Sequence, residues 1–225
     1  MQGLGSSVFL QWPYILRLLQ GLWVTVRIAL VSVGFSAILG VLFGLALAGR
    51  SRVVKAVGLF YLEAMRIVPV LVWLFVFYFG VPKLLSIHLD SEVVAILVFT
   101  LWGTAEMGDI VRGAVTSLPK HQFESGQALG LTPAQLQQYV IVPQAVRRML
   151  PAAINLATRM VKTTSLVVLI NVVELLKVGQ QIIEASILSN PSAPLTVYGT
   201  IFVLYFIICW PLSVFSKKLE AKWQS

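Results

Sequence analysis

The sequence has few of the charged residues that cover the surface of a soluble protein. Only 12% of its 225 residues are charged, whereas 58% are hydrophobic, and the mean hydropathy is +0.87. Soluble domains carry about 25% charged residues, so the composition excludes that class and indicates an integral membrane protein. The hydrophobic runs are continuous and do not alternate with polar residues. This pattern favours membrane-spanning helices over the short strands of a β-barrel.

The residues that most often form metal sites and nucleophiles are also scarce. Cys209 is the single cysteine and lies within a hydrophobic run, which excludes a disulfide framework and a cysteine-based metal site. The two histidines, His88 and His121, are expected in loops on opposite sides of the membrane, so they cannot share a metal ion. No phosphate-binding G-x-x-x-x-G-K-[ST] motif occurs. We therefore expect no catalytic residue, metal or cofactor in this chain, and no enzymatic activity of its own.

Acidic residues are outnumbered by basic ones, 9 to 17, and the net charge is +8. The basic residues lie in short loops beside hydrophobic runs, where the positive-inside rule explains them without a nucleic-acid partner. Counting flanking residues predicts an amino terminus outside and a carboxyl terminus in the cytoplasm. The inner set is Arg50, Arg52, Lys55, Arg66, Lys120, Arg147, Arg148, Lys217, Lys218 and Lys222, and the outer set is Arg17, Lys83 and Lys177.

Five segments are hydrophobic enough to span a bilayer, which needs about 20 helical residues. They cover about 22–49, 59–82, 93–113, 149–173 and 193–215. The second segment must carry Arg66 near its inner end, and Pro69 would interrupt its hydrogen bonding. Between these segments we expect an interfacial lead-in at 1–20, a short outer loop at 83–92, and an outer helix or re-entrant segment at 174–190. The sequence thus predicts an all-α membrane protein with one transmembrane domain over residues 1–225.

One long polar stretch, residues 117–145, interrupts the hydrophobic segments and is expected in the cytoplasm. Its first predicted helix runs from Lys120 to Leu129 and stops at Gly130, a residue suited to a left-handed C-terminal cap. A second helix begins directly afterwards. Thr132 is a good N-cap, Pro133 fits the first helical position, and Gln135 can close a capping box. Pro143 is predicted to end this second helix, since proline lacks an amide donor.

The same stretch resembles the EAA loop of binding-protein-dependent ABC importer permeases. In that loop an E-A-A triplet is followed by glycine after three residues and by I-x-L-P after nine more. Glu124, Gly130 and Pro143 match at these spacings, while Ser125 and Gly126 replace the alanines. Val140 and Val142 replace the isoleucine and leucine.

Other motifs resemble the polar amino acid branch of these permeases. They are Arg66-Ile-Val-Pro-Val-Leu-Val-Trp-Leu-Phe75, Pro143-Gln-Ala-Val-Arg147, Leu150-Pro151, Asn155 and Lys162-Thr-Thr-Ser-Leu166. The sequence departs from the branch at three positions. Trp73 stands where glutamine is common, Thr163 where aspartate is common, and Glu106 where tyrosine is usual.

The resemblance implies a permease subunit of an ATP-driven amino acid importer in a bacterial inner membrane, working by alternating access. Its implied partners are a second permease, identical or homologous, an ATP-binding subunit that holds ATP and Mg²⁺, and a periplasmic or surface solute-binding protein. The ATP-binding subunit would dock on the loop. The residues implied in that coupling are Phe123, Glu124, Gly126, Gly130, Leu131, Thr132 and Pro143. The apolar residues Phe123, Leu129, Leu131 and Leu136 offer a face for the partner's groove, or alternatively pack on the protein's own core.

Polar residues within the spanning segments are candidates for the substrate pathway, because ionisable groups are costly inside a membrane. The candidates are Glu106, Asp109, Asn155, Lys162, Thr163, Thr164 and Ser165. Several have structural alternatives. Asp109 could pair with Arg112 three residues away, Arg159 could reach toward the membrane surface, and Glu106 could either line a cavity or pair internally.

Two further questions stay open at the level of sequence. Gly40 and Gly44 form a small-xxx-small pair that could bring two helices close together, or they are simply tolerated in a membrane helix. Glu106 and Asp109 would also permit a gradient-driven carrier or channel, or a membrane enzyme that uses them as acid and base. In a carrier the two-helix loop would have no purpose, and an enzyme would lack a nearby histidine or metal cluster.

Overall fold

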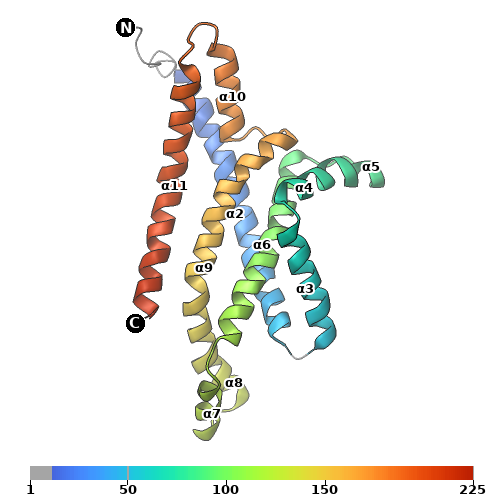
Figure 1. The fold of residues 1–225 in the computed structure, drawn as a ribbon, viewed down its shortest axis with the longest axis vertical. Helices are drawn as coiled ribbons and strands as arrows, with labels where there is room; N and C mark the ends of the chain where they lie inside the picture. Colours follow the sequence, from blue (N-terminus) through green and yellow to red (C-terminus); the bar gives the residue numbers. More distant parts are fainter. Residues whose placement is uncertain (1–11, 50, 225) are drawn as a thin grey trace.

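The structure, a computed structural model, describes residues 12–49 and 51–224, and every regular element in this part of the chain is helical. Long helices run side by side in one bundle, and two short helices project beyond it at one end, which we call the loop end (Figure 1). The elements are α2 (Trp12–Ala48), α3 (Arg52–Ile67), α4 (Val70–Phe75), η1 (Val76–Gly80), α5 (Val81–Leu85), α6 (Ser91–Thr116), α7 (Lys120–Ala128), α8 (Pro133–Leu136), η2 (Gln137–Ile141), α9 (Val142–Thr163), η3 (Thr164–Ile170), α10 (Leu175–Ser186) and α11 (Ala193–Gln224).

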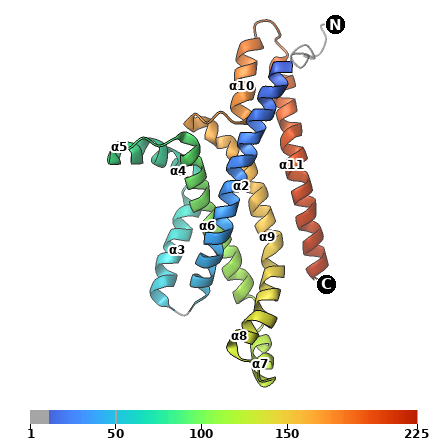
Figure 2. The same cartoon turned by 180° about the vertical axis from the view of Figure 1, so that it is seen from behind.

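Four helical runs of the described residues can cross a membrane by length and composition, and a bent pair of helices makes a fifth when it is counted as one span. The four runs are α2, α6, residues 133–170 and α11. The fifth is the pair formed by α3 and residues 70–85, which is bent by 98°. The predicted all-α membrane protein with five spanning segments is thereby confirmed. The segment predicted at 174–190 contains α10, which lies beside α2 and α11 at the end opposite the loop end (Figures 1 and 2).

Two spanning helices extend further than predicted. α2 begins at Trp12, so residues 12–20 of the expected lead-in are helical, while residues 1–11 and Arg50 lie outside the described residues. Polar contacts hold these early turns: Arg17 donates to the side chain of Gln181 at 2.5 Å, and Arg27 pairs with Glu92 at 2.5 Å. α11 continues past Phe215 to Gln224 and carries the basic residues of the carboxyl-terminal segment on its last turns.

The second predicted segment is not one straight helix. Val68 is extended (φ −79°, ψ 124°), as expected before a proline, and α3 ends at Ile67. Arg66 therefore lies in the last turn of α3, about 21 Å along the helix axis from Arg52. The prediction that Arg66 sits near the inner end was wrong. It was also wrong to place all of 83–92 in a loop, because α5 continues to Leu85.

The prediction that Pro143 ends the second loop helix was wrong. The chain stays helical from Pro133 to Ile170, because a π-helical turn, η2, directly precedes Val142 and Pro143. In that turn the amide of Val142 donates to the carbonyl of Gln137, five residues back, which opens the space that the proline ring requires. The same arrangement occurs at η1, which directly precedes Val81 and Pro82. The predicted fourth segment, 149–173, is thus continuous with the loop, and its helix stops at Ile170.

Small residues bring α2 and α6 into close contact. A methyl group added to Gly40 would lie 2.5 Å from the Cβ of Met107, and one added to Gly44 would lie 2.5 Å from the carbonyl oxygen of Gly108. Ser36 lies one turn before Gly40 and donates to the carbonyl of Thr100 at 3.3 Å. The small-xxx-small interpretation of Gly40 and Gly44 is therefore correct, since backbones that approach this closely leave no space for a side chain.

A buried carboxylate attaches α10 to the bundle. Glu174 caps α10 by accepting from the amides of Leu176 at 2.9 Å and Lys177 at 2.8 Å, and the hydroxyl of Thr25 on α2 lies 3.4 Å away. Burial raises the pKa of the Glu174 carboxyl, although the two amide donors oppose that shift. Gly21 leaves room for this contact, because a Cβ there would lie 3.0 Å from the Cα of Leu175.

We predict that Gly44→Val weakens the α2–α6 contact, because the added methyl groups would overlap Gly108 and Val111. Overpacking of this kind costs about 1–3 kcal/mol. The midpoint of thermal unfolding of the purified protein in detergent should fall. Gly34→Val is the matched control, since Gly34 lies on the same helix with no neighbour within 4 Å. Equal midpoints for the two variants would show that close approach at Gly44 is not required.

Candidate functional site

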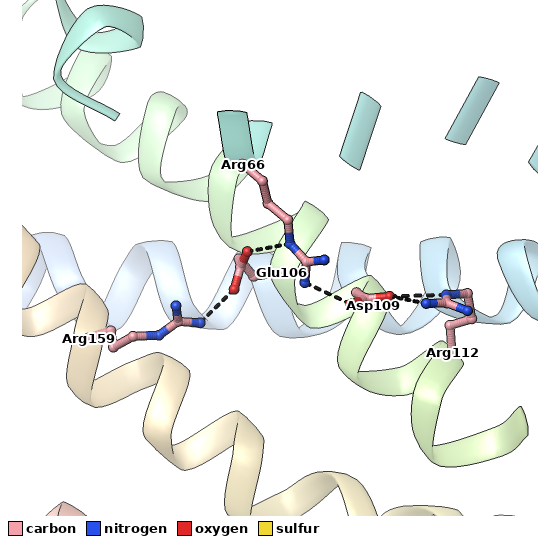
Figure 3. Close-up of polar contacts among 5 residues, drawn as sticks. All are labelled: Arg66, Glu106, Asp109, Arg112 and Arg159. Atoms are coloured by element: carbon pink, nitrogen blue, oxygen red, sulfur yellow. Dashed lines mark hydrogen bonds and ion pairs between the residues drawn. The ribbon is translucent and has the colours of Figure 1, made fainter. Parts of the chain in front are cut away.

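A cluster of five charged side chains joins three helices in the middle of the bundle (Figure 3). α6 supplies Glu106, Asp109 and Arg112, whose spacing of three residues places them on one side of the helix. Arg66, in the last turn of α3 and just before the bend at Pro69, lies beside that side of α6. α9 supplies Arg159 from the opposite direction. We call these residues the charge cluster.

Every carboxylate oxygen in the charge cluster accepts from a guanidinium group. Glu106 Oε1 accepts from Arg66 Nε at 2.9 Å, and its Oε2 accepts from Arg159 at 2.6 Å. Asp109 Oδ2 accepts from Arg66 at 2.7 Å, and its Oδ1 accepts from Arg112 at 2.5 and 3.0 Å. Arg66 therefore bridges the two carboxylates, and Glu106 bridges α3 and α9.

The burial of the charge cluster explains why its charges must be paired. The side chain of Glu106 is only 11% exposed, and an unpaired carboxylate there would carry a large desolvation cost. Arg159 is more open, with 51% of its side chain exposed, and it lies over the ring of Trp102 with its guanidinium carbon 5.6 Å from the ring centroid. Of the two sequence alternatives for Glu106, the structure shows internal pairing. Asp109 pairs with Arg112 as the alternative interpretation held, and Arg159 points to Glu106 rather than to the membrane surface.

A polar face runs along α9 next to the charge cluster. Asn155, Arg159 and Lys162 are exposed and follow one another at intervals of four and three residues, so they share one side of the helix. We call these three residues the open face. Thr163 and Ser165 are half-buried, and their hydroxyls donate to the carbonyls of Arg159 and Lys162. Thr164 is fully buried within the chain, so it does not belong to the open face.

Large apolar side chains cover much of the exposed surface of α2 and α11. The outward side chains of α2 include Leu30, Phe35, Ile38, Leu42 and Leu45, and those of α11 include Leu195, Phe202, Val203, Phe206, Ile207 and Trp210. α9 faces the viewer in Figure 1, whereas α2 covers the bundle in the reverse view of Figure 2. Lipid can cover the apolar surfaces, but Arg159 and Lys162 need polar surroundings. The open face is therefore the part of the described surface best suited to a water-filled pathway or a polar partner.

The open face ends in a hollow toward the loop end. This cavity has a volume of about 260 Å³ and lies between α9 and the last turns of α11. Its lining comprises Arg147, Arg148, Pro151, Ala152, Asn155, Glu220 and Trp223. Asn155 thus connects the hollow with Arg159 and Lys162.

The two-helix loop has the local structure that its sequence predicts. α7 ends at Ala128, and Gly130 takes a left-handed conformation (φ +76°). Thr132 and Gln135 form the capping box: the amide of Gln135 donates to Thr132 Oγ1 at 3.3 Å, and the amide of Thr132 donates to Gln135 Oε1 at 2.9 Å. Glu124 is exposed on α7.

Most of the predicted apolar face of the loop packs against other residues of the same chain. Leu136 is buried in a small core, and Phe123 and Leu131 pack against that core. Gly126 is buried against Leu136, where a side chain would not fit. Only Leu129 of the four predicted residues is strongly exposed, at 81%. Internal packing, the alternative interpretation, is therefore correct for the other three.

Hydrogen bonds connect this compact loop to the bundle. Arg148 donates to the carbonyl of Ser117 at 2.8 Å, and Gln144 donates to the side chain of Gln122 at 3.0 Å. Both bonds join the start of α9 to the other side of the loop. The loop and α9 are therefore attached to each other through the helix itself and through these contacts.

The predicted site residues fall into two groups that are far apart in the fold. Glu106 and Asp109 meet in the charge cluster, and Asn155 and Lys162 lie beside it on the open face. Phe123, Glu124, Gly126, Gly130, Leu131 and Thr132 lie together at the loop end, and Pro143 begins the helix that connects the two groups. Arg66 and Arg159 were not among the predicted site residues. The sequence did contain a feature that could have identified them: two carboxylates within spanning segments require cationic partners.

Fold and site together define a class: a polytopic helical membrane protein with a polar face and a charged contact among its helices, as expected of a transport component. Comparison with known proteins narrows this class. Residues 40–222 match the family described as the binding-protein-dependent transport system inner membrane component. The chain belongs to this family and is a multi-pass inner membrane protein.

Relatives and solved structures agree with that assignment. The glutamine transport system permease protein GlnP of Escherichia coli (strain K12) is 32% identical over 94% of both chains. The L-cystine transport system permease protein TcyB of Bacillus subtilis (strain 168) is 31% identical over 94% of this chain and 87% of the relative. The fold resembles that of an amino acid ABC transporter crystallised with histidines, with a TM-score of 0.80 at 24% identity, covering 92% of this chain and 95% of the other.

We predict that Glu106→Gln destabilises the bundle, because it removes the charge that Arg66 and Arg159 share. Hydrogen bonds to charged groups contribute about 1.5–3 kcal/mol, so the midpoint of thermal unfolding should decrease by several degrees. Glu63→Gln is the control, since Glu63 is an exposed carboxylate on α3 that forms no ion pair within the described residues. A Glu106→Gln midpoint equal to that of the wild type would contradict a role in holding α3 and α9.

Proposed function

We propose that this chain is the membrane-spanning subunit of an ATP-driven importer of polar amino acids. It works beside a second permease, identical or homologous, with an ATP-binding subunit on the cytoplasmic side and a solute-binding protein outside. ATP and Mg²⁺ bind to the ATP-binding subunit, and this chain binds no cofactor of its own. The amino terminus lies outside and the carboxyl terminus in the cytoplasm. Family membership supports the class, and the names of several relatives support the amino acid cargo.

The observation that carries the mechanism is the unbroken helix from the loop to the open face. Residues 133–170 form one helical run, and about 39 Å of helix separates Pro133 from Arg159. A displacement of the loop by the ATP-binding subunit moves the open face along with it. The partner permease presents an equivalent face, and the pathway between the two faces opens first to one side of the membrane and then to the other.

Glu106 is the point at which this movement meets the rest of the bundle. Its carboxylate holds Arg159 on the moving helix and Arg66 on α3. Both arginines are partly exposed, so water can replace part of each contact during the transition. The charge cluster thereby allows α9 to change its position relative to α3 while each charged side chain keeps either an ion-pair partner or contact with water.

Reconstitution in lipid vesicles tests this proposal. The purified chain, co-expressed with its neighbouring transporter genes, should retain an ATP-binding subunit and should take up a labelled amino acid only when ATP and the binding protein are present. Uptake driven by a proton or sodium gradient without ATP would instead establish a secondary carrier, the alternative that the sequence left open.

The joint between α7 and α8 gives a first variant. Gly130→Pro should abolish coupled uptake while the protein still inserts, because proline cannot take a φ of +76° and loses the amide that donates to Gln127 at 2.9 Å. The strain amounts to about 1–3 kcal/mol. Gly130→Asn is the matched control, since asparagine tolerates this conformation. Normal uptake by the proline variant at wild-type expression would exclude Gly130 as the joint.

The exposed carboxylate of α7 gives a second variant. Glu124→Lys should reduce recovery of the ATP-binding subunit in a pull-down, because it reverses a charge on the surface that we assign to docking. Glu124→Gln should have a smaller effect, since it removes the charge without introducing repulsion. Unchanged recovery and transport for Glu124→Lys would remove Glu124 from the docking surface.

A further inference from the structure

The charges around the open face do not balance. The charge cluster contains two carboxylates and three guanidinium groups, and all four carboxylate oxygens already accept from arginines. Lys162, on the next turn of α9, adds a fourth cation. Within residues 12–49 and 51–223, no carboxylate forms an ion pair with Lys162. The middle of the open face therefore carries a surplus of positive charge.

The surplus continues toward the loop end. The hollow below Asn155 is lined by two arginines, Arg147 and Arg148, and by one carboxylate, Glu220. Along this side of α9 the cations thus outnumber the carboxylates at each level. A cationic side chain that entered here would find no carboxylate surplus to bind it.

Arg159 and Lys162 are arranged to hold an anion. Arg159 uses one terminal nitrogen for Glu106, and a guanidinium group has five N–H donors in all, so donors remain on its exposed side. Trp102 supports the guanidinium group from one side, which fixes its orientation. Side chains three residues apart on a helix begin about 5–6 Å from each other, a spacing at which one carboxylate can accept from both cations.

We propose that Arg159 and Lys162 bind the carboxylate of the amino acid in transit, and that the cargo is a neutral polar or acidic amino acid rather than a cationic one. This inference rests on the proposed function. Glu106 takes no part in binding the cargo directly: it positions Arg159, and its own charge is used in doing so. Asn155, one turn away on the same face, provides an amide that can donate to or accept from a polar cargo side chain.

Direct binding to the transporter separates this selectivity from that of the solute-binding protein. The permease with its ATP-binding subunit, purified in detergent without the solute-binding protein, is titrated with radiolabelled glutamate, glutamine and arginine. We expect glutamate or glutamine to bind at least about tenfold more tightly than arginine, the usual size of one charge-assisted hydrogen bond. Tighter binding of arginine than of both others would overturn the inference.

Charge reversal at Lys162 provides the sharper test. Lys162→Glu should change the ratio of glutamate to arginine affinity by about tenfold or more in favour of arginine, because it converts the surplus cation into an anion. Lys162→Gln should weaken glutamate binding without improving arginine binding. This variant replaces Lys162→Glu as the test if the Glu variant does not fold. Lys83→Glu is the matched control, since it makes the same charge change at an exposed position on α5, away from the open face.

The outcomes distinguish the two proposals. ATP-dependent uptake of an amino acid with an affinity ratio unaltered by either Lys162 variant would overturn this inference and leave the proposed function standing. Absence of ATP-dependent uptake for every amino acid tested would overturn both. A ratio that shifts for Lys162→Glu and not for Lys83→Glu supports the assignment of the carboxylate site.

Discussion

A carboxylate inside a membrane bundle needs a cation beside it, and in this protein Glu106 shares two. Its 2.9 and 2.6 Å contacts with Arg66 and Arg159 fix where α3 and α9 lie relative to α6. They add to the apolar packing of α3, in which Leu62 and Met65 are buried in the core and the hydroxyl of Tyr61 donates to the carbonyl of Leu101 at 2.6 Å. The bend at Pro69 has a role in the same contact, because it ends α3 at the level where Arg66 reaches α6. The charge cluster is thus a structural element first, and its position next to the open face connects it to function.

The tight contact between α2 and α6 provides the fixed part of the bundle. Gly40 and Gly44 let the two backbones approach so closely that no side chain would fit at either position. On the other side of α6, contacts to α9 and α3 are partly polar and partly exposed, so they can be exchanged for water at lower cost. The same helix, α6, therefore has one side suited to permanent packing and one suited to rearrangement. This asymmetry suits the alternating-access mechanism that we propose, in which some helix contacts are kept and others are exchanged.

Local chemistry made the loop predictable from the sequence, whereas tertiary contacts determined what the sequence analysis misplaced. Gly130, Thr132 and Gln135 interact only with neighbours within a few residues, and each has the predicted geometry. Pro143 was misjudged because a π-helical turn, a rare element, absorbs its effect. The position of Arg66 was misjudged because the second segment bends by 98°, and the size of such a bend cannot be predicted from the neighbouring residues alone. Which of Phe123, Leu129 and Leu131 would be buried likewise depends on how α7 folds against α8, since all three suit either a core or an interface.

The continuity of residues 133–170 changes how the loop is understood. A loop helix that ended at Pro143 would be joined to the membrane by flexible backbone, and a push on it would be lost in that joint. A proline accommodated by a π-helical turn leaves the chain helical on both sides, with the amide of Val142 donating to the carbonyl of Gln137. In the function we propose, this helix carries loop movement to Arg159, and Arg159 is bound to Glu106 while it faces the open side of the bundle. The residue to which we assign this movement is also the one that we propose to hold the cargo, so a displacement of the loop would alter position and binding at the same side chain.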